Sequence, residues 1–287
     1  AVAAQASRVW KAHDPVFATR CLVAAERAFE AARTSDSRAP SESDTLGGLG
    51  YLDSDAGDEV FWASVELALA TGKPKYIGLV TSSSWFNITP PNDGSGVPAI
   101  INWNMMLGPA TLDLVMVEGP FTAEQLAPVR DMLRDTAEAY LEEVSRGGYR
   151  TTLQRQTYGA STTFNLLRNA IVLMHVFDFS KQPRFRSGAL RSLEWILGRN
   201  PLGQVYVTGF GAQPVEHPHH GYWSGNPPPG MLVNGPNGDT TDPFASSQLR
   251  GRAQQKSYAD TPEAISTNRV SDHGNAALAW VVTALAD

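Results

Sequence analysis

Apolar residues recur at helical spacing along most of this 287-residue chain, and residues that end helices follow the runs. Residues 15–33 place apolar side chains on one helical face and charged side chains on the other, which predicts an amphipathic helix. Residues 34–57, rich in Ser, Asp and Gly, predict a loop. A second helical pattern begins near Asp58 and ends at Gly72 and Pro74, which are typical of a helix terminus. The sequence therefore predicts helices joined by polar loops, with few strands.

The same kind of pattern continues in the second half of the chain. Thr122 and Gln125 have the spacing of a capping box, which opens a helix that runs through Arg146. Residues 77–120 give no clear pattern. Three further helices are predicted at residues 161–179, 183–197 and 276–286. About seven or eight helices in successive antiparallel pairs predict an all-α toroid or bundle rather than an α/β fold.

A Gly/Pro-rich segment of roughly sixty residues separates the last two of these helices, and long loops in compact chains are usually functional. It carries His217-Pro218-His219-His220, followed by Tyr222 and Trp223. Imidazole groups next to flat aromatic faces offer the hydrogen bonds and apolar contacts that a sugar ring requires. The alternative is a surface loop that merely contains these residue types. A zinc site is not predicted, because Cys21 is the only cysteine and no HExxH pattern accompanies the histidines.

Composition narrows the class of protein. The chain is 42% hydrophobic and 18% charged, which is enough for one sizeable core, and we expect a single domain over residues 1–287. A formal net charge of -6 argues against nucleic acid or an anionic membrane as the main partner, since both require a basic face. No apolar run approaches the ~18 residues of a membrane span. The start lacks both Met and a signal-peptide pattern, so we expect a processed or cleaved product.

Several stretches carry a family resemblance in the right order along the chain. They are Asp58-Glu59-Val60-Phe61-Trp62-Ala63, Leu197-Gly198-Arg199-Asn200-Pro201-Leu202-Gly203, Tyr206-Val207-Thr208-Gly209-Phe210-Gly211, the histidine run at 217–220, and Pro227-Pro228-Pro229-Gly230-Met231-Leu232-Val233. Together they resemble the C-terminal two-thirds of the catalytic domain of glycoside hydrolase family 9, the inverting cellulases and related β-glycan hydrolases. The resemblance covers nearly the whole chain. It implies an all-α (α/α)6 barrel, or toroid, that lacks its N-terminal helices in this chain.

The resemblance implies hydrolysis of β-1,4-glucan or a related β-glycan with inversion, which requires a carboxylic acid and a carboxylate base. In the family the base belongs to an Asp-Ala-Gly-Asp motif near the start of the domain. Asp55-Ala56-Gly57-Asp58 has that form, but it continues directly into a stretch that resembles a later helix of the barrel. Either these residues supply the base, or the base lies on an N-terminal segment that completes the barrel.

The residue at the position of the catalytic acid differs from the one that the family has. The family's last signature has an aromatic-x-Asp group, a Glu nine residues after that Asp, and then Asn-Ala; Tyr258-Ala259-Asp260 and Asn275-Ala276 match it. The Glu position is Arg269, and an arginine cannot donate a proton at a working pH. Three neighbouring groups are candidates to replace it, namely Asp272, Glu263 and His273.

By its motif position, His219 is expected to contact the sugar near the cleavage point, with Asp260 as a retained active-site carboxylate. We expect the remaining substrate-binding residues to be the imidazoles and rings of His217, His220, Tyr158, Tyr222 and Trp223. The alternatives are that Asp260 caps a loop and that Tyr222 and Trp223 pack within it. Arg269 at the acid position would also suit an acidic sugar, through bidentate pairing with a carboxylate.

Two functions follow from these residues. The first is an endoglucanase-like hydrolase that degrades a β-glucan polymer or oligosaccharide. The second is a glycan-binding relative on the same barrel that has lost the catalytic acid, as Arg269 suggests. We expect a secreted or periplasmic location, because polymeric glycans are met outside the cytoplasm. No organic cofactor or metal ligand set is predicted, and the sequence leaves open whether a calcium ion is bound.

Overall fold

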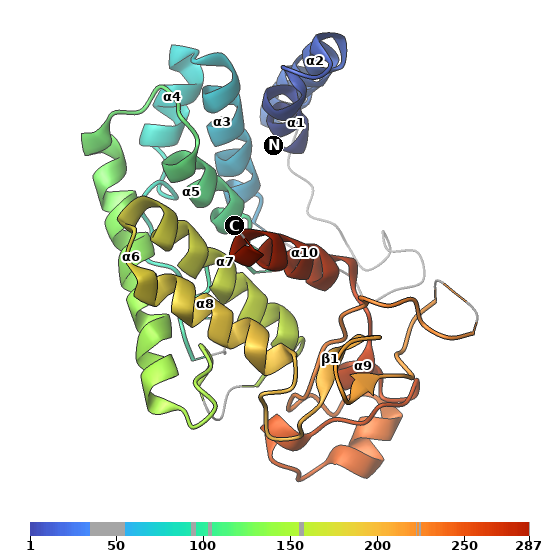
Figure 1. Cartoon of the computed structure of the whole chain (residues 1–287). Coiled ribbons are helices and arrows are strands. Elements are labelled where there is room, and N and C mark those ends of the chain that lie inside the picture. Colours follow the sequence, from blue (N-terminus) through green and yellow to red (C-terminus); the bar gives the residue numbers. More distant parts are fainter. Residues whose placement is uncertain are drawn as a thin grey trace. The chain divides into compact units, whose positions relative to one another are not determined.

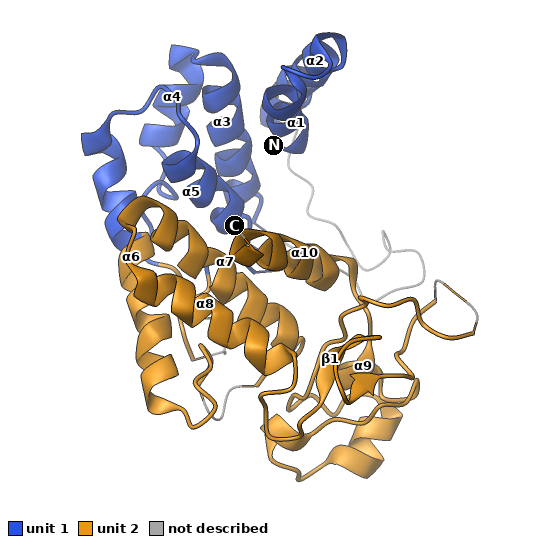
Figure 2. Ribbon diagram, viewed as in Figure 1, with its two compact units in different colours: residues 1–89, 100–132 blue, residues 90–99, 133–287 orange. Residues whose placement is uncertain are grey.

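The computed structural model describes residues 1–34, 55–92, 96–102, 105–154, 158–221, 223 and 225–286, and helices dominate it (Figure 1). The chain divides into two compact units (Figure 2). Unit 1 comprises residues 1–89 and 100–132, and unit 2 comprises residues 90–99 and 133–287. The expectation of a single domain stays a prediction. None of the described helices has both the length and the apolarity that a membrane span requires.

Unit 1 consists of helices, and those at Pro15–Thr34 and Gly57–Thr71 confirm the two predicted in this part of the sequence. Its helices are α1 (Val2–Trp10), α2 (Pro15–Thr34), α3 (Gly57–Thr71), α4 (Pro74–Thr81) and α5 (Leu107–Met116). Helix α1 packs on α2 and α3, and α3 packs on α4 and α5. Helix α3 ends where the sequence predicts, because Gly72 adopts a left-handed conformation (φ 64°) and Pro74 stands at the start of α4. The loop predicted at 34–57 falls mostly outside the described residues.

A partly buried polar cluster, which we call the Arg8 cluster, joins three helices of unit 1. Arg8 Nη2 on α1 lies 2.6 Å from Glu66 Oε2 on α3 and 2.8 Å from Asp113 Oδ2 on α5. Trp62 Nε1 donates to Glu66 Oε1 at 3.2 Å, and Gln5 Nε2 donates to Asp113 Oδ2 at 3.0 Å. The Glu66 side chain is fully buried. Burial and the neighbouring Asp113 raise the pKa of Glu66 to about 7, against the lowering effect of Arg8.

Helix α6 (Ala123–Arg146) carries the chain from unit 1 into unit 2 and begins with the predicted capping box. Thr122 N donates to Gln125 Oε1 at 2.8 Å, and Gln125 N donates to Thr122 Oγ1 at 3.2 Å. These reciprocal bonds satisfy two backbone donors that a helix start leaves without partners. Val129, Leu133 and Tyr140 of this helix are buried.

Unit 2 places three helices together, α7 (Thr162–Ser180), α8 (Pro183–Ile196) and α10 (Asp272–Ala286) (Figure 2). The first two match the predicted ranges closely. Helix α10 begins four residues before the predicted 276, because Asn275 N already donates to Ser271 O in a helical bond. The residues of this first turn are polar, so the apolar pattern did not reveal them.

The long segment between α8 and α10 contains short elements that the sequence did not predict. They are β1 (Val205–Thr208), β2 (Pro214–Val215), a π-helical turn η2 (Ala245–Leu249), a 3-10 turn η3 (Gln254–Lys256) and α9 (Ile265–Asn268). Strands β1 and β2 pair in parallel. All four residues of β1 are buried, so its sequence shows an apolar run instead of the alternation that marks a half-exposed strand.

Candidate functional site

The histidine run and the segment around Arg269 lie side by side in unit 2, although fifty residues separate them in the sequence. His219 N donates to Asn268 O at 2.8 Å, and Val270 N donates to His219 O at 3.0 Å, which makes His219 and Arg269 a parallel bridge pair. On the other side of this segment, Asn234 N donates to Arg269 O at 3.0 Å. The backbone at Arg269 is therefore held between two other stretches of chain.

Asn268 is the buried centre of this arrangement, and it was not among the site residues expected from the sequence. Its side chain is shielded from solvent. Asn268 Nδ2 donates to His217 O at 2.7 Å, and Tyr258 OH donates to Asn268 Oδ1 at 2.6 Å. The only sequence signal was its place directly before Arg269 in the C-terminal signature. Asn268 positions both the histidine run and the Arg269 segment.

Asp260 makes the contacts of a loop-capping carboxylate. Its two oxygens accept hydrogen bonds from Glu216 N at 2.7 Å and from His217 N at 2.9 Å. His217 Nδ1 also lies 3.8 Å from Asp260 Oδ2, while the His217 ring itself is largely exposed. These contacts are those of the alternative considered for Asp260, and its catalytic role stays a prediction.

His219 presents one ring nitrogen to a ligand. His219 Nδ1 lies 2.8 Å from Pro262 O. A carbonyl oxygen can only accept, so Nδ1 carries the proton, and in the neutral ring Nε2 carries the lone pair. His219 Nε2 has no hydrogen-bond partner among the described residues. This nitrogen is available to a sugar hydroxyl, as the expected contact requires.

The aromatic residues expected to stack on sugar rings have different surroundings. The rings of His220 and Trp223 stack on each other, with centroids 3.4 Å apart and planes 12° apart. The stacking covers one face of each ring. Tyr222 lies outside the described residues.

The position of Tyr158 contradicts the expectation that its ring contacts a sugar. Its side chain is 2% exposed, its hydroxyl lies 3.3 Å from Thr151 Oγ1, and its ring packs against Trp195 at 5.9 Å. Burial raises the pKa of Tyr158. A ring enclosed in this way has no face to offer a sugar, so Tyr158 belongs to the core of unit 2.

Two of the three candidate replacements for the acid have unfavourable surroundings. A hydrogen bond from Thr261 lowers the pKa of Glu263, so this carboxyl holds its proton less well than usual. Burial lowers the pKa of His273, Asp272 raises it, and the positive Arg269 lowers it again, leaving it below its ordinary value. An efficient acid must hold its proton near the working pH. Glu263 and His273 are therefore poor proton donors at neutral pH.

The Asp-Ala-Gly-Asp stretch serves helix starts in unit 1. Asp55 Oδ1 accepts a hydrogen bond from Gly57 N at 2.8 Å at the beginning of α3. Asp58 is buried, and its Oδ2 accepts from Met106 N at 2.5 Å at the beginning of α5. Carboxylates stabilise helix N-termini in this way. The contacts favour the later-helix interpretation of this stretch over the base.

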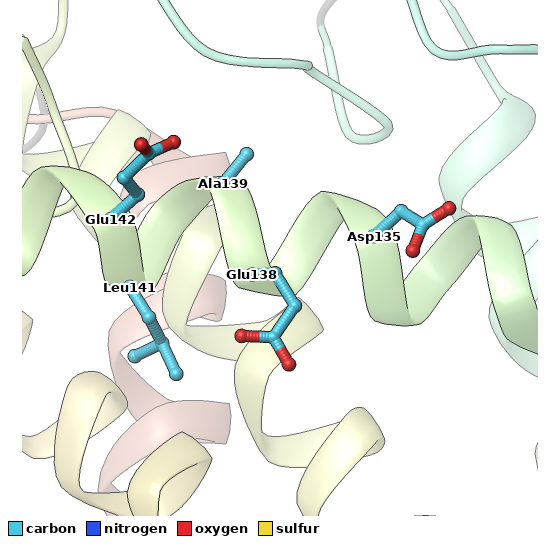
Figure 3. Close-up of a pocket in the computed structure, with 5 residues that line it drawn as sticks. All are labelled: Asp135, Glu138, Ala139, Leu141 and Glu142. Atoms are coloured by element: carbon cyan, nitrogen blue, oxygen red, sulfur yellow. The ribbon is translucent and has the colours of Figure 1, made fainter.

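A shallow hollow on α6 does not have the character of a site. It is lined by Asp135, Glu138, Ala139, Leu141 and Glu142, whose side chains point in different directions (Figure 3). Glu138 is ion-paired with Arg184, and Glu142 with Arg146. A binding site needs polar groups that converge, and two of these three carboxylates are already ion-paired.

Metal binding finds no support in the side chains whose positions are described. Across those residues, no group of three or more His, Cys, Asp or Glu side chains could hold a metal ion. Calcium is also bound through backbone carbonyls, so the question of calcium stays open.

Comparison with known proteins identifies the family of the chain. The model of glycosyl hydrolase family 9 matches residues 1–282. The chain belongs to this family. It is 31% identical to a cellulose 1,4-beta-cellobiosidase of Acetivibrio thermocellus over 99% of this chain and 35% of that protein. It is 32% identical to endoglucanase C of Cellulomonas fimi over 100% of this chain and 27% of that protein.

Solved family 9 structures confirm the fold class. A thermostable endoglucanase from Alicyclobacillus acidocaldarius matches 99% of this chain and 53% of its own, with a TM-score of 0.87 and 26% identity. The structure of AaCel9A in complex with cellobiose-like isofagomine matches 99% and 53%, with a TM-score of 0.86 and 26% identity. The chain thus has the fold of the (α/α)6 barrel over about half the length of these structures, and it spans about a third of the curated relatives.

Proposed function

We propose that this chain binds β-1,4-glucan at the histidine run, as part of the catalytic domain of a secreted or periplasmic glycoside hydrolase. The observation that carries the proposal is the pairing of His219 with Arg269. This pairing brings the histidine run and the family's acid segment to one face of unit 2, as a joint substrate site requires. A family 9 structure whose bound ligand is described as cellobiose-like supports a glucan as the ligand.

The residues of the run have separate roles in this proposal. His219 Nε2 hydrogen-bonds a sugar hydroxyl, because Nδ1 is engaged with Pro262 O. The stacked His220 and Trp223 rings supply the aromatic surface next to the sugar. The exposed His217 ring, anchored through its backbone to Asp260, contacts a neighbouring sugar.

Hydrolysis with inversion requires a base about 6.5–9.5 Å from the acid, on the opposite face of the sugar ring. Both Asp55 and Asp58 are engaged at helix starts. We therefore propose that the base belongs to a further segment of the barrel. That segment would act as a partner of this chain, covalently joined or separate.

A second candidate function is glycan binding without hydrolysis. The specific observation in its favour is Arg269 at the position of the family's acid, with Glu263 and His273 poorly suited to replace it. In that case the protein has kept the barrel and the glycan-binding residues and has lost the proton donor.

One experiment separates the two functions. The purified protein is incubated with carboxymethyl cellulose, mixed-linkage glucan and cello-oligosaccharides. Reducing ends are measured against buffer, and the intact mass is determined alongside. Turnover by a protein larger than 287 residues supports the hydrolase with a base on a further segment. Absence of turnover, with cello-oligosaccharide binding detected by calorimetry, supports the second candidate. Absence of both turnover and binding contradicts both.

A variant tests whether the acid position alone decides between the two functions. Arg269→Glu restores a carboxyl group at the family's acid position. Suppose that the barrel has its catalytic base and that loss of the acid is its only defect. Arg269→Glu then gains turnover, whereas the control Arg252→Glu, at another exposed arginine, does not. Equal turnover by both variants and the parent protein would contradict a role for position 269 in the reaction.

A further inference from the structure

Arg269 is an exposed residue in an extended segment, directly after α9, whose backbone is hydrogen-bonded on both sides. Its neighbours Asn268 and Val270 are buried, and its backbone is extended (φ -80°, ψ 135°). Successive side chains of an extended chain point to opposite faces, so the Arg269 side chain points away from the interior of unit 2. The backbone bonds to His219 and Asn234 fix where this side chain begins.

The charge of Arg269 is not neutralised by a neighbour. Among the residues that the structure describes, its guanidinium has no hydrogen bond and no carboxylate within ion-pair distance. The nearby Asp260 is engaged by two backbone N–H groups, and Glu263 by Thr261. A guanidinium carries five N–H donors in a planar fork that matches a carboxylate.

His219 stands next to Arg269 on the same face. Paired residues of adjacent strands project their side chains to one side of the ladder, with the strands about 5 Å apart. The Nε2 acceptor of His219 and the donors of the guanidinium therefore belong to side chains that leave the same side of the paired backbone. A ligand that fits both must offer an anionic group to Arg269 and a hydroxyl donor to His219.

We propose that Arg269 and His219 together bind a uronosyl residue of a β-glycan, with Arg269 pairing to the sugar carboxylate and His219 accepting from a neighbouring hydroxyl. A free inorganic anion lacks the hydroxyl donor. A neutral glucosyl residue lacks the carboxylate. The proposal rests on the glycan-binding function proposed above and adds the chemical class of the sugar.

Two matched ligands test this. Cello-oligosaccharides and the same oligosaccharides oxidised at C6 differ only in the carboxylates, and calorimetry measures the Kd of each. We expect the oxidised form to bind about tenfold more tightly, as a hydrogen-bonded charge pair typically provides. Arg269→Gln should abolish the preference, so that the Kd values of the two ligands become equal. Arg269→Lys should keep only part of it, because an ammonium lacks the planar fork.

Controls distinguish failure of this inference from failure of the proposed glycan binding. Arg252→Gln, an exposed arginine elsewhere in unit 2, should bind both ligands as the parent does. Equal Kd values for the two ligands in the parent protein would overturn the inference and leave the proposed glycan binding intact. Failure to bind either ligand would overturn both. Tighter binding of a 6-O-sulfated oligosaccharide than of the oxidised one, or full competition by inorganic sulfate, would overturn the choice of a carboxylate.

Discussion

Arg8 in unit 1 and Arg269 in unit 2 are the same residue type in opposite circumstances. Arg8 bonds to two carboxylates, one of them fully buried, and joins three helices. Arg269 is exposed and has no ion pair among the described residues, although its backbone is held on both sides. The comparison teaches that a charge whose partners lie within the fold serves stability, whereas a charge fixed in place without a partner is available to a ligand.

The largest effect should come from removing the buried pairing. Arg8→Met leaves Glu66 and Asp113 without their cation, and breaking a largely buried pair in this way should lower the free energy of unfolding by about 3–4 kcal/mol. Urea unfolding measures it, with the exposed Arg27→Met on α2 as the control. An unchanged midpoint would show that the Arg8 cluster does not hold these helices together.

Because Glu66 in the Arg8 cluster has a raised pKa, the stability of the protein should depend on pH. Because the folded-state pKa is about 7, above the ordinary 4.5, the folded chain binds more protons than the unfolded chain between these values. The stability that Glu66 contributes through its raised pKa is therefore present at low pH and is lost as the pH rises from about 4.5 to about 7, by about 3 kcal/mol in total.

Glu66→Gln should remove this dependence, so the variant gains stability relative to the parent as the pH rises. Urea midpoints at about pH 5 and about pH 8 provide the measurement. A constant difference between variant and parent across this range would contradict the raised pKa.

The smallest effect on the free energy of unfolding should come from substitution of Arg269, and the adjacent Asn268 provides the contrast. Asn268→Ala removes a buried side chain that bonds to His217 O and Tyr258 OH, and it should cost about 2 kcal/mol of unfolding free energy. Arg269→Gln should change that free energy by less than about 0.5 kcal/mol, because the guanidinium contacts solvent. Thermal unfolding of the two variants side by side decides. A comparable loss in both would mean that Arg269 has a structural role and would remove the contrast with Arg8.

Helix positions and ends followed from the sequence because their signals are local. Gly72 after α3, Pro183 at the start of α8 and the Thr122–Gln125 capping box act within a few residues of the chain. The family's stretches likewise appear in sequence order, and they located the histidine run and the acid position. The substitution at residue 269 was visible in the sequence alone.

The surroundings of the site residues depended on contacts between distant parts of the chain. Tyr158 precedes a helix and carries no local sign that Trp195 and Gln254 enclose it. The central place of Asn268 depends on His217, 51 residues away.

The sequence by itself determined the helical class, the family and the chemical identity of each candidate group, because these depend on periodicity, caps and ordered motifs. The tertiary structure decided which groups meet and which are shielded from water. It set the raised pKa of Glu66, the burial of Tyr158 and the pairing of His219 with Arg269. The physical reason is that burial and electrostatic environment are properties of the packed chain, to which residues far apart in sequence contribute jointly.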